Sequence, residues 1–201
     1  MNYLAHAYLS FGQDEVLVGN FIGDFVKGKM MNTFPEEVQH GIKLHREIDK
    51  FTDTHPLVRA GQSYLRPKYR LYSTVITDIY FDYFLAKNWG RYSDIPLEEF
   101  IQNTFSTLKH NRQLFPERFL NMFQWMVQEN WLIQYREIEG IHKTLSGMSR
   151  RTRFPSKMEM AHLDLMEKEQ EFQVIFFAFF ADLETFAREK LLEIQNTNAG
   201  H

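Results

Sequence analysis

The chain contains no cysteine among its 201 residues. This absence excludes disulfide bonds, thiolate nucleophiles and cysteine-ligated zinc. It also fits a reducing compartment, and we therefore expect a cytoplasmic protein. No internal repeat, linker or low-complexity segment divides the sequence.

Long apolar runs and an excess of basic residues are missing as well. The longest apolar run, Val174 to Phe180, is far shorter than the ~20 residues that cross a bilayer. The first ten residues, MNYLAHAYLS, lack the basic start and apolar stretch of a signal peptide. The formal net charge is -3, whereas proteins that grip nucleic acid nonspecifically are usually basic. We expect neither a membrane nor a nucleic acid as partner.

Hydrophobic residues make up 44% of the chain and aromatic residues 15%, enough for one globular domain with a substantial core. Period-two alternation is nowhere sustained, whereas helical spacing recurs almost throughout. We predict an all-α fold, a single-domain helical bundle over residues 1–201 with about eight or nine helices. The predicted helices cover about residues 1–10, 15–29, 35–55, 57–65, 69–89, 96–111, 116–140, 141–148 and 156–194. Pro67 is expected to break the fourth of them.

One helix carries polar residues on a face that should be apolar. Val38, Ile42, His45, Asp49 and Thr52 follow each other at helical spacing in the stretch that ends with GIKLHREIDKFTDTHP. His45 and Asp49 are four residues apart, so their side chains meet on one face. An ionised aspartate on a buried face needs a partner or a metal ion. The alternative is a structural pair bonded to Arg46 or to loop amides.

A second helix repeats the anomaly, since Leu71, Val75, Asp78, Asp82 and Leu85 form one predicted inward stripe. Two carboxylates on one buried face repel each other, and a divalent cation between them removes the conflict. Two helices with inward His and Asp residues can build a metal site between them. Imidazole and carboxylate together suit Mn, Fe or Zn better than Mg.

His6 and Asp24 are weaker candidates for the same site. Asp24 lies on the apolar stripe of the predicted helix 15–29, but it can also form an ordinary ion pair with the Lys27–Lys29 segment. His6 follows a tyrosine-rich start and can equally be a hydrogen-bonded core residue.

Basic residues form two local clusters in this acidic chain. The clusters are Arg59, Arg66, Lys68 and Arg70, and then Arg150, Arg151, Arg153 and Lys157. Each is either a solvated surface or a site for phosphate or an acidic protein, because arginine binds such groups through paired hydrogen bonds.

Five segments, in this order, resemble the acyl carrier protein phosphodiesterase family. They are MNYLAHAYLS, GNFIGDFVKG, GIKLHREIDKFTDTHP, ITDIYFDYFLAKNW and GMSRRTRF. The similarity covers residues 1 to about 155, and five matching blocks are far more specific than any one of them.

The resemblance implies an enzyme that hydrolyses the phosphodiester between 4′-phosphopantetheine and a serine of acyl carrier protein, which is small and acidic. It implies a divalent metal, manganese, and a distant similarity to the all-α HD phosphohydrolases. The implied metal ligands are His6, Asp24, His45, Asp49, Asp78 and Asp82. We assign catalysis to Asp24, His45, Asp49 and Asp78, and substrate binding to Arg46, Arg150, Arg151 and Arg153.

The chain departs from the HD pattern in one respect. It has no adjacent His-Asp doublet, because Arg46 follows His45 and Gly23 precedes Asp24. The ligand set therefore rests on the helical stripes rather than on the wider superfamily. Two other readings stay open: an HD-like phosphohydrolase acting on a small nucleotide, and a helical binding protein whose inward acids form structural ion pairs. The sequence does not determine the oligomeric state.

Overall fold

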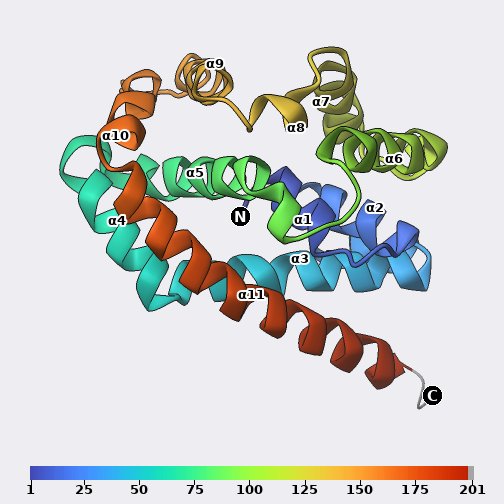
Figure 1. The fold of residues 1–201 in the computed structure, drawn as a ribbon. Coiled ribbons are helices and arrows are strands. Elements are labelled where there is room, and N and C mark those ends of the chain that lie inside the picture. The colour runs from blue at the N-terminus through green and yellow to red at the C-terminus, as the bar shows by residue number, and fades with distance from the viewer. Residues whose placement is uncertain (199–201) are drawn as a thin grey trace.

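A computed structural model describes residues 1–198, and within this range the protein is all-α, as predicted (Figure 1). The predicted domain also includes residues 199–201, which lie outside the described residues. The α-helices are α1 Tyr3–Tyr8, α2 Asp14–Ile22, α3 Glu36–Thr54, α4 Pro56–Tyr69, α5 Ser73–Lys87, α6 Leu97–His110, α7 Glu117–Gln128, α8 Trp131–Gln134, α9 Ile138–Ser149, α10 Ala161–Glu167 and α11 Glu169–Asn198. Short 3₁₀ helices join them: η1 Gly23–Phe25, η2 Gly28–Thr33, η3 Arg70–Tyr72, η4 Trp89–Arg91, η5 Arg112–Leu114 and η6 Met158–Met160.

The count of eight or nine helices is too low, because the described range holds eleven α-helices. The apolar residues keep their helical spacing across points where the backbone leaves the helical conformation, so the sequence pattern merges helices that are separate in the structure. The chain turns between α7 and α8 at Asn130, whose φ of 47° is left-handed. Asparagine tolerates that conformation better than most residues. The predicted helix 15–29 ends as an α-helix at Ile22 and is followed by two 3₁₀ helices, the second of which begins at Gly28 with a φ of 52°.

The expected break at Pro67 is wrong, because α4 continues through Pro67 to Tyr69. Proline removes one backbone donor from a helix and crowds the preceding turn. Pro67 stands only two residues before the end of α4, so little helix remains for it to disrupt. The helix ends instead at Arg70, whose φ of 52° is left-handed.

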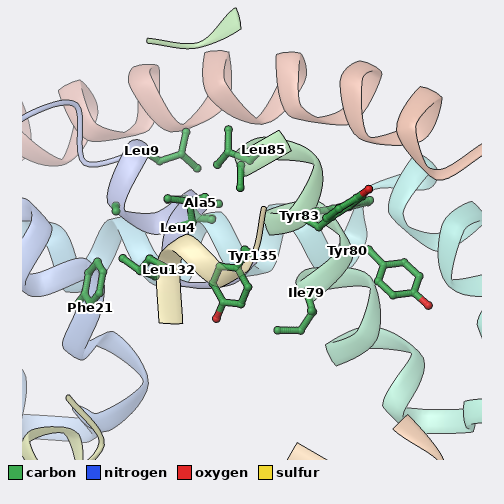
Figure 2. Close-up of a cluster of buried hydrophobic side chains, with 14 of the residues drawn as sticks. Leu4, Ala5, Leu9, Phe21, Ile79, Tyr80, Tyr83, Leu85, Leu132 and Tyr135 are labelled. Atoms are coloured by element: carbon green, nitrogen blue, oxygen red, sulfur yellow. The ribbon is translucent and has the colours of Figure 1, made fainter. Parts of the chain in front are cut away.

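Helix α5 lies at the centre of the molecule (Figure 1). Helices α3, α4 and α11 pack together on one side of it, and α6 to α9 form an arc on the other. Helix α1 contacts both α2 and α5, and the start of the chain is therefore enclosed. Figure 2 shows Leu4 of α1, and Leu9 directly after it, in one apolar cluster with Leu85 of α5, Leu132 of α8 and Phe21 of α2.

The predicted stripe on α3 is confirmed, because Val38, Ile42, His45 and Thr52 are buried. The stripe on α5 is wrong at its beginning. Leu71 is 90% exposed and Val75 38% exposed, whereas Asp82 is fully buried. Leu71 belongs to η3, and the buried face at the start of α5 is formed by Ser73, Ile76 and Thr77 instead.

None of the helices in residues 1–198 combines the length and the apolar character that crossing a membrane requires.

Candidate metal centre

Four predicted site residues from three separate elements meet at one place. His6 comes from α1, Asp24 from η1, and His45 and Asp49 from α3. The Nε2 atom of His45 lies 3.2 Å from Asp24 Oδ1 and 3.2 Å from Asp49 Oδ2. The Nε2 atom of His6 lies 3.2 Å from Asp49 Oδ1. The two imidazole rings stack with their centroids 4.3 Å apart, so both Nε2 atoms reach the same carboxylate.

Asp24 lies beside His45 because the backbone of the preceding residue, Gly23, packs directly against the His45 ring. A Cβ atom on Gly23 would lie only 2.4 Å from Cγ of His45, well inside van der Waals contact. Glycine is therefore needed at this position for the ring to stay where it is. The same 3₁₀ turn then carries the Asp24 carboxylate onto His45 Nε2. The side chain of Asp24 is 69% exposed, so this edge of the cluster faces solvent.

The buried amide of Asn20 fixes the tautomer of His6. Its Nδ2 atom donates to the His6 carbonyl at 3.0 Å and to Ser10 Oγ at 3.1 Å. The Oδ1 atom of Asn20 is thereby left to accept, and it lies 2.8 Å from His6 Nδ1. The proton of neutral His6 must then be on Nδ1, and the lone pair is on Nε2. A side chain that orients a ligating histidine through its other nitrogen is typical of metal sites.

This arrangement fits a bound cation. Burial, and then the charge of neighbouring His45, lower the pKa of His6, which favours the neutral ring. Its Nε2 lone pair then faces the Asp49 carboxylate, so two electron-rich atoms oppose each other without a proton between them. Neither Nε2 of the histidine pair has a partner with hydrogen-bond geometry within residues 1–198. His6, His45 and Asp49 offer three ligand atoms, all within 4.8 Å of one another.

Without a cation, the positive charge on this cluster is that of protonated His45. Burial alone would lower the pKa of His45, but close contacts with Asp24 and Asp49 outweigh it and raise this pKa to about 9. Burial opposes ionisation of Asp49, yet its contacts with His45 and His6 hold its pKa well below the usual range. The contact with His45 also lowers the pKa of Asp24. A strongly ionised carboxylate beside two imidazoles is a favourable donor set for Mn, Fe or Zn.

Asp78 of α5 lies next to this cluster and shares a partner with it. The α-amino nitrogen of Met1 is 3.3 Å from Asp49 Oδ1 and 3.4 Å from Asp78 Oδ1. Burial would lower the pKa of the amine, but the charges of Asp78 and Asp49 raise it to about 10. Burial raises the pKa of Asp78 to about 6, although the amine opposes that shift.

Asp82 faces a different group from the other predicted ligands. Its Oδ2 accepts a hydrogen bond from the backbone N–H of Leu4 at 2.8 Å, and its Oδ1 accepts from Ala5 at 3.2 Å. These are the second and third residues of α1, whose N–H groups have no partner inside the helix. Burial raises the pKa of Asp82 to about 7 against the effect of these bonds. Asp82 thus holds α1 against α5 and lies outside the group of three ligand atoms.

The predicted substrate-binding arginines lie in two places. Arg46 follows His45 on α3, is exposed, and donates from Nη2 to the carbonyl of Val26 at 2.8 Å. Arg150, Arg151 and Arg153 are exposed where α9 leads towards η6. Only Arg46 is adjacent in sequence to a residue of the histidine cluster.

Sequence patterns missed two residues that shape this centre, Asn20 and Gly23. Asn20 is a completely buried amide within the apolar run of α2, and an isolated polar residue of this kind was the available signal. Gly23 carried no signal, because its role depends on a contact with His45 from a distant helix.

Known proteins match this chain over nearly its whole length. The family model described as acyl carrier protein phosphodiesterase matches residues 1–183. An acyl carrier protein phosphodiesterase from Pectobacterium atrosepticum is 31% identical over 193 residues, which cover 96% of this chain and all of that relative. One of that name from Escherichia coli O139:H28 is 35% identical over 174 residues, covering 83% and 90%. No solved structure matches the chain at a meaningful level. The chain therefore belongs to the acyl carrier protein phosphodiesterase family.

Proposed function

We propose that this protein hydrolyses the phosphodiester that joins 4′-phosphopantetheine to the serine of holo-acyl carrier protein, releasing the apo carrier. Membership of the family and the names of its relatives support this activity. A cytoplasmic location belongs to the same proposal, since a chain without cysteine suits a reducing compartment.

The position of His6 Nε2, 3.2 Å from Asp49 Oδ1 while Asn20 holds the other ring nitrogen, is the observation that carries the proposed metal dependence. We assign His6, His45 and Asp49 as ligands of a divalent cation, manganese in our proposal, with Asp24 completing the set from the solvent side. A cation bound there would lower the pKa of a coordinated water and neutralise charge on the phosphate oxygens.

Three further residues orient the proposed ligands or the substrate. Asn20 keeps the proton of His6 on Nδ1, which directs Nε2 towards the cluster. Asp78 and Asp49 both contact the α-amino group of Met1. We propose that Asp78 takes part in catalysis from this position beside the metal ligands. The exposed side chain of Arg46 is held by the carbonyl of Val26, two residues after Asp24, and we propose that it meets a non-bridging phosphate oxygen there.

The exposure of the cluster supports a protein-sized substrate over a small nucleotide. The Asp24 side chain is 69% exposed and that of Asp49 35% exposed, so the carboxylate side of the cluster is open to solvent, while the two histidine Nε2 atoms lie beneath it. A phosphodiester at the surface of a folded carrier can approach such a site without unfolding. The reading as a structural binding protein predicted lysine or arginine on Asp78 and Asp82. Asp82 meets backbone N–H groups instead, and Asp78 meets the α-amino group of Met1.

Hydrolysis can be measured directly by mass spectrometry. Holo-acyl carrier protein incubated with the wild-type protein and Mn²⁺ should lose the mass of the phosphopantetheine group, and EDTA should prevent the loss. Asp49→Asn and His6→Gln should reduce the initial rate at least a hundredfold, because each removes a proposed ligand. Glu37→Gln serves as the matched control, since Glu37 is an exposed acid near the other end of α3.

Full activity in EDTA-treated protein would remove the metal from the proposal. Intact holo carrier after prolonged incubation with the wild-type protein and Mn²⁺, Fe²⁺ or Zn²⁺ would contradict the proposed reaction itself.

A further inference from the structure

We propose that the α4–α5 turn carries the docking surface for the carrier protein, an inference that rests on the proposed function. The surface consists of Arg59, Arg66 and Arg70, together with Leu71 and Val75, and we call it the turn surface. It joins an exposed apolar pair to three exposed cations, and it leads along α5 to the metal centre.

Val75 of the apolar pair lies three residues before Asp78 on α5, and Leu71 lies in the η3 turn just before this helix. Leu71 is 90% exposed, the largest exposed fraction among the large hydrophobic residues of the described chain, and Val75 is 38% exposed. At 1.5 Å per residue, Val75 lies about 5 Å along the axis of α5 from Asp78, and Leu71 lies farther out, in the η3 turn that precedes α5. A partner seated on this pair would therefore present its surface next to the candidate metal centre.

The backbone at Arg70 is strained. Its φ of 52° and ψ of -122° fall in a region that only glycine occupies readily. A residue other than glycine in this conformation costs roughly 1–3 kcal/mol, and such strain persists mainly at functional positions. Here it turns the chain sharply between α4 and α5 and leaves Leu71 exposed.

The three arginines lie on one side of α4 and its end. Arg59 and Arg66 are seven residues apart on α4, so they share a helical face, and Arg70 directly follows the last residue of this helix. All three side chains are exposed. Arg59 also donates to the carbonyl of Asp53, at the end of α3, so the row begins near the helix that carries the histidine cluster.

The second basic cluster lies at the same end of the molecule. Lys68 Nζ is 2.7 Å from Asp164 Oδ2, and Tyr69 also donates to Asp164, so α10 is attached to the end of α4 (Figure 1). Ser149 donates to Glu159 at 2.5 Å, which ties the end of α9 to η6. The loop with Arg150, Arg151 and Arg153 is therefore held on the α10 side of the turn surface and adds to its positive charge.

Charge complementarity selects the occupant. An acidic carrier protein meets two groups of arginines, while Leu71 and Val75 supply the apolar contact that a charge-only encounter lacks. Opposite charges mainly accelerate association, whereas buried apolar anchors mainly slow dissociation. The two parts of the surface thus predict separate kinetic effects.

Surface plasmon resonance with a carrier whose acceptor serine is replaced by alanine isolates docking from chemistry. Leu71→Ser should weaken binding about tenfold, chiefly through faster dissociation. Arg66→Glu should slow association several-fold at low salt, with a difference that shrinks as salt rises. The matched controls are Leu192→Ser, 57% exposed near the far end of α11, and Arg118→Glu, an exposed arginine on α7. Both controls should bind as the wild type does.

A separate variant tests the strain. Arg70→Gly should raise the melting temperature by about 2–4 °C, because glycine relieves the strained conformation, and should still weaken carrier binding. A gain in stability together with a loss of binding would not arise from misfolding.

Equal affinities of the wild type, Leu71→Ser and Arg66→Glu would overturn the turn surface, even if the wild type hydrolyses holo carrier normally. Binding to phosphatidylglycerol vesicles without any binding to the carrier would also overturn it. Failure of the wild type to release phosphopantetheine would instead contradict the proposed function.

Discussion

At the residue scale, the proposed cation site depends on the direction in which the Nε2 lone pair of His6 points. Asn20 accepts from His6 Nδ1 and donates to Ser10, so its amide cannot be turned round without losing both bonds. We expect Asn20→Leu to lower manganese affinity by about 10–100-fold, the usual effect of losing a partner that orients a ligand. Isothermal titration calorimetry measures this directly.

Ser10→Ala is the matched control for Asn20→Leu. It removes one partner of the Asn20 amide but leaves the contact between Asn20 Oδ1 and His6 Nδ1. Its manganese affinity should stay close to the wild-type value. An equal loss in both variants would mean that general loosening of the core, rather than the His6 tautomer, governs binding.

A second prediction at the residue scale concerns the close contact between Gly23 and the His45 ring. In Gly23→Ala the added Cβ would lie 2.4 Å from Cγ of His45, so the ring must move away from Asp24 and Asp49. We expect at least a tenfold loss of manganese affinity. Gly147→Ala is the control, because a Cβ there meets no atom within 4 Å. It should bind manganese normally and gain about 0.5–1 kcal/mol of stability, since alanine suits a helix better than glycine.

At the element scale, Asp82 determines how α1 is attached to α5. Asp82→Ala would leave the buried N–H groups of Leu4 and Ala5 without acceptors, which should cost about 3 kcal/mol of unfolding free energy even without metal. Asp82→Asn keeps one acceptor oxygen and should lose about half as much. Urea denaturation measures both values. If Asp82→Ala unfolds like the wild type in EDTA but loses manganese binding, Asp82 is a ligand rather than an anchor.

Helical spacing in the sequence predicted which residues share a helical face better than it predicted which distant segments contact one another. Spacing on α3 correctly placed His45 and Asp49 together, because local periodicity alone decides which residues share a helical face. It failed for Leu71, because this residue lies in the η3 turn before α5 begins, and the helical spacing of α5 does not extend to it. Asp24 was expected on an inward helical face, but α2 ends at Ile22 and leaves Asp24 exposed. The partners of Asp82 lie 77 and 78 residues away in sequence, and no local pattern contains such a contact.

At the scale of the whole molecule, the candidate metal centre joins segments that are far apart in sequence. His6, Asp24 and Asp49 come from α1, η1 and α3, and the Met1 amine links Asp49 to Asp78 of α5. A cation held by several of these segments binds the folded chain and not the unfolded one. Its binding free energy therefore adds to the stability of the fold. We propose that residues 1–201 form one domain, so that a bound cation stabilises the whole fold and not one part of it.

The last prediction follows from that coupling. At a free Mn²⁺ concentration of about 100 times its dissociation constant, the gain in stability is about 2.7 kcal/mol. For a chain of this size that corresponds to a melting temperature roughly 5–10 °C higher. Differential scanning calorimetry should show one cooperative transition that Mn²⁺ raises and EDTA returns to its original position. Asp49→Asn should abolish the shift and Glu37→Gln should keep it. A rise in melting temperature on adding EDTA would contradict the metal centre. Two separated transitions, only one of which responds to Mn²⁺, would contradict the single domain, because the metal would then stabilise only the part of the chain that contains α1, α3 and η1.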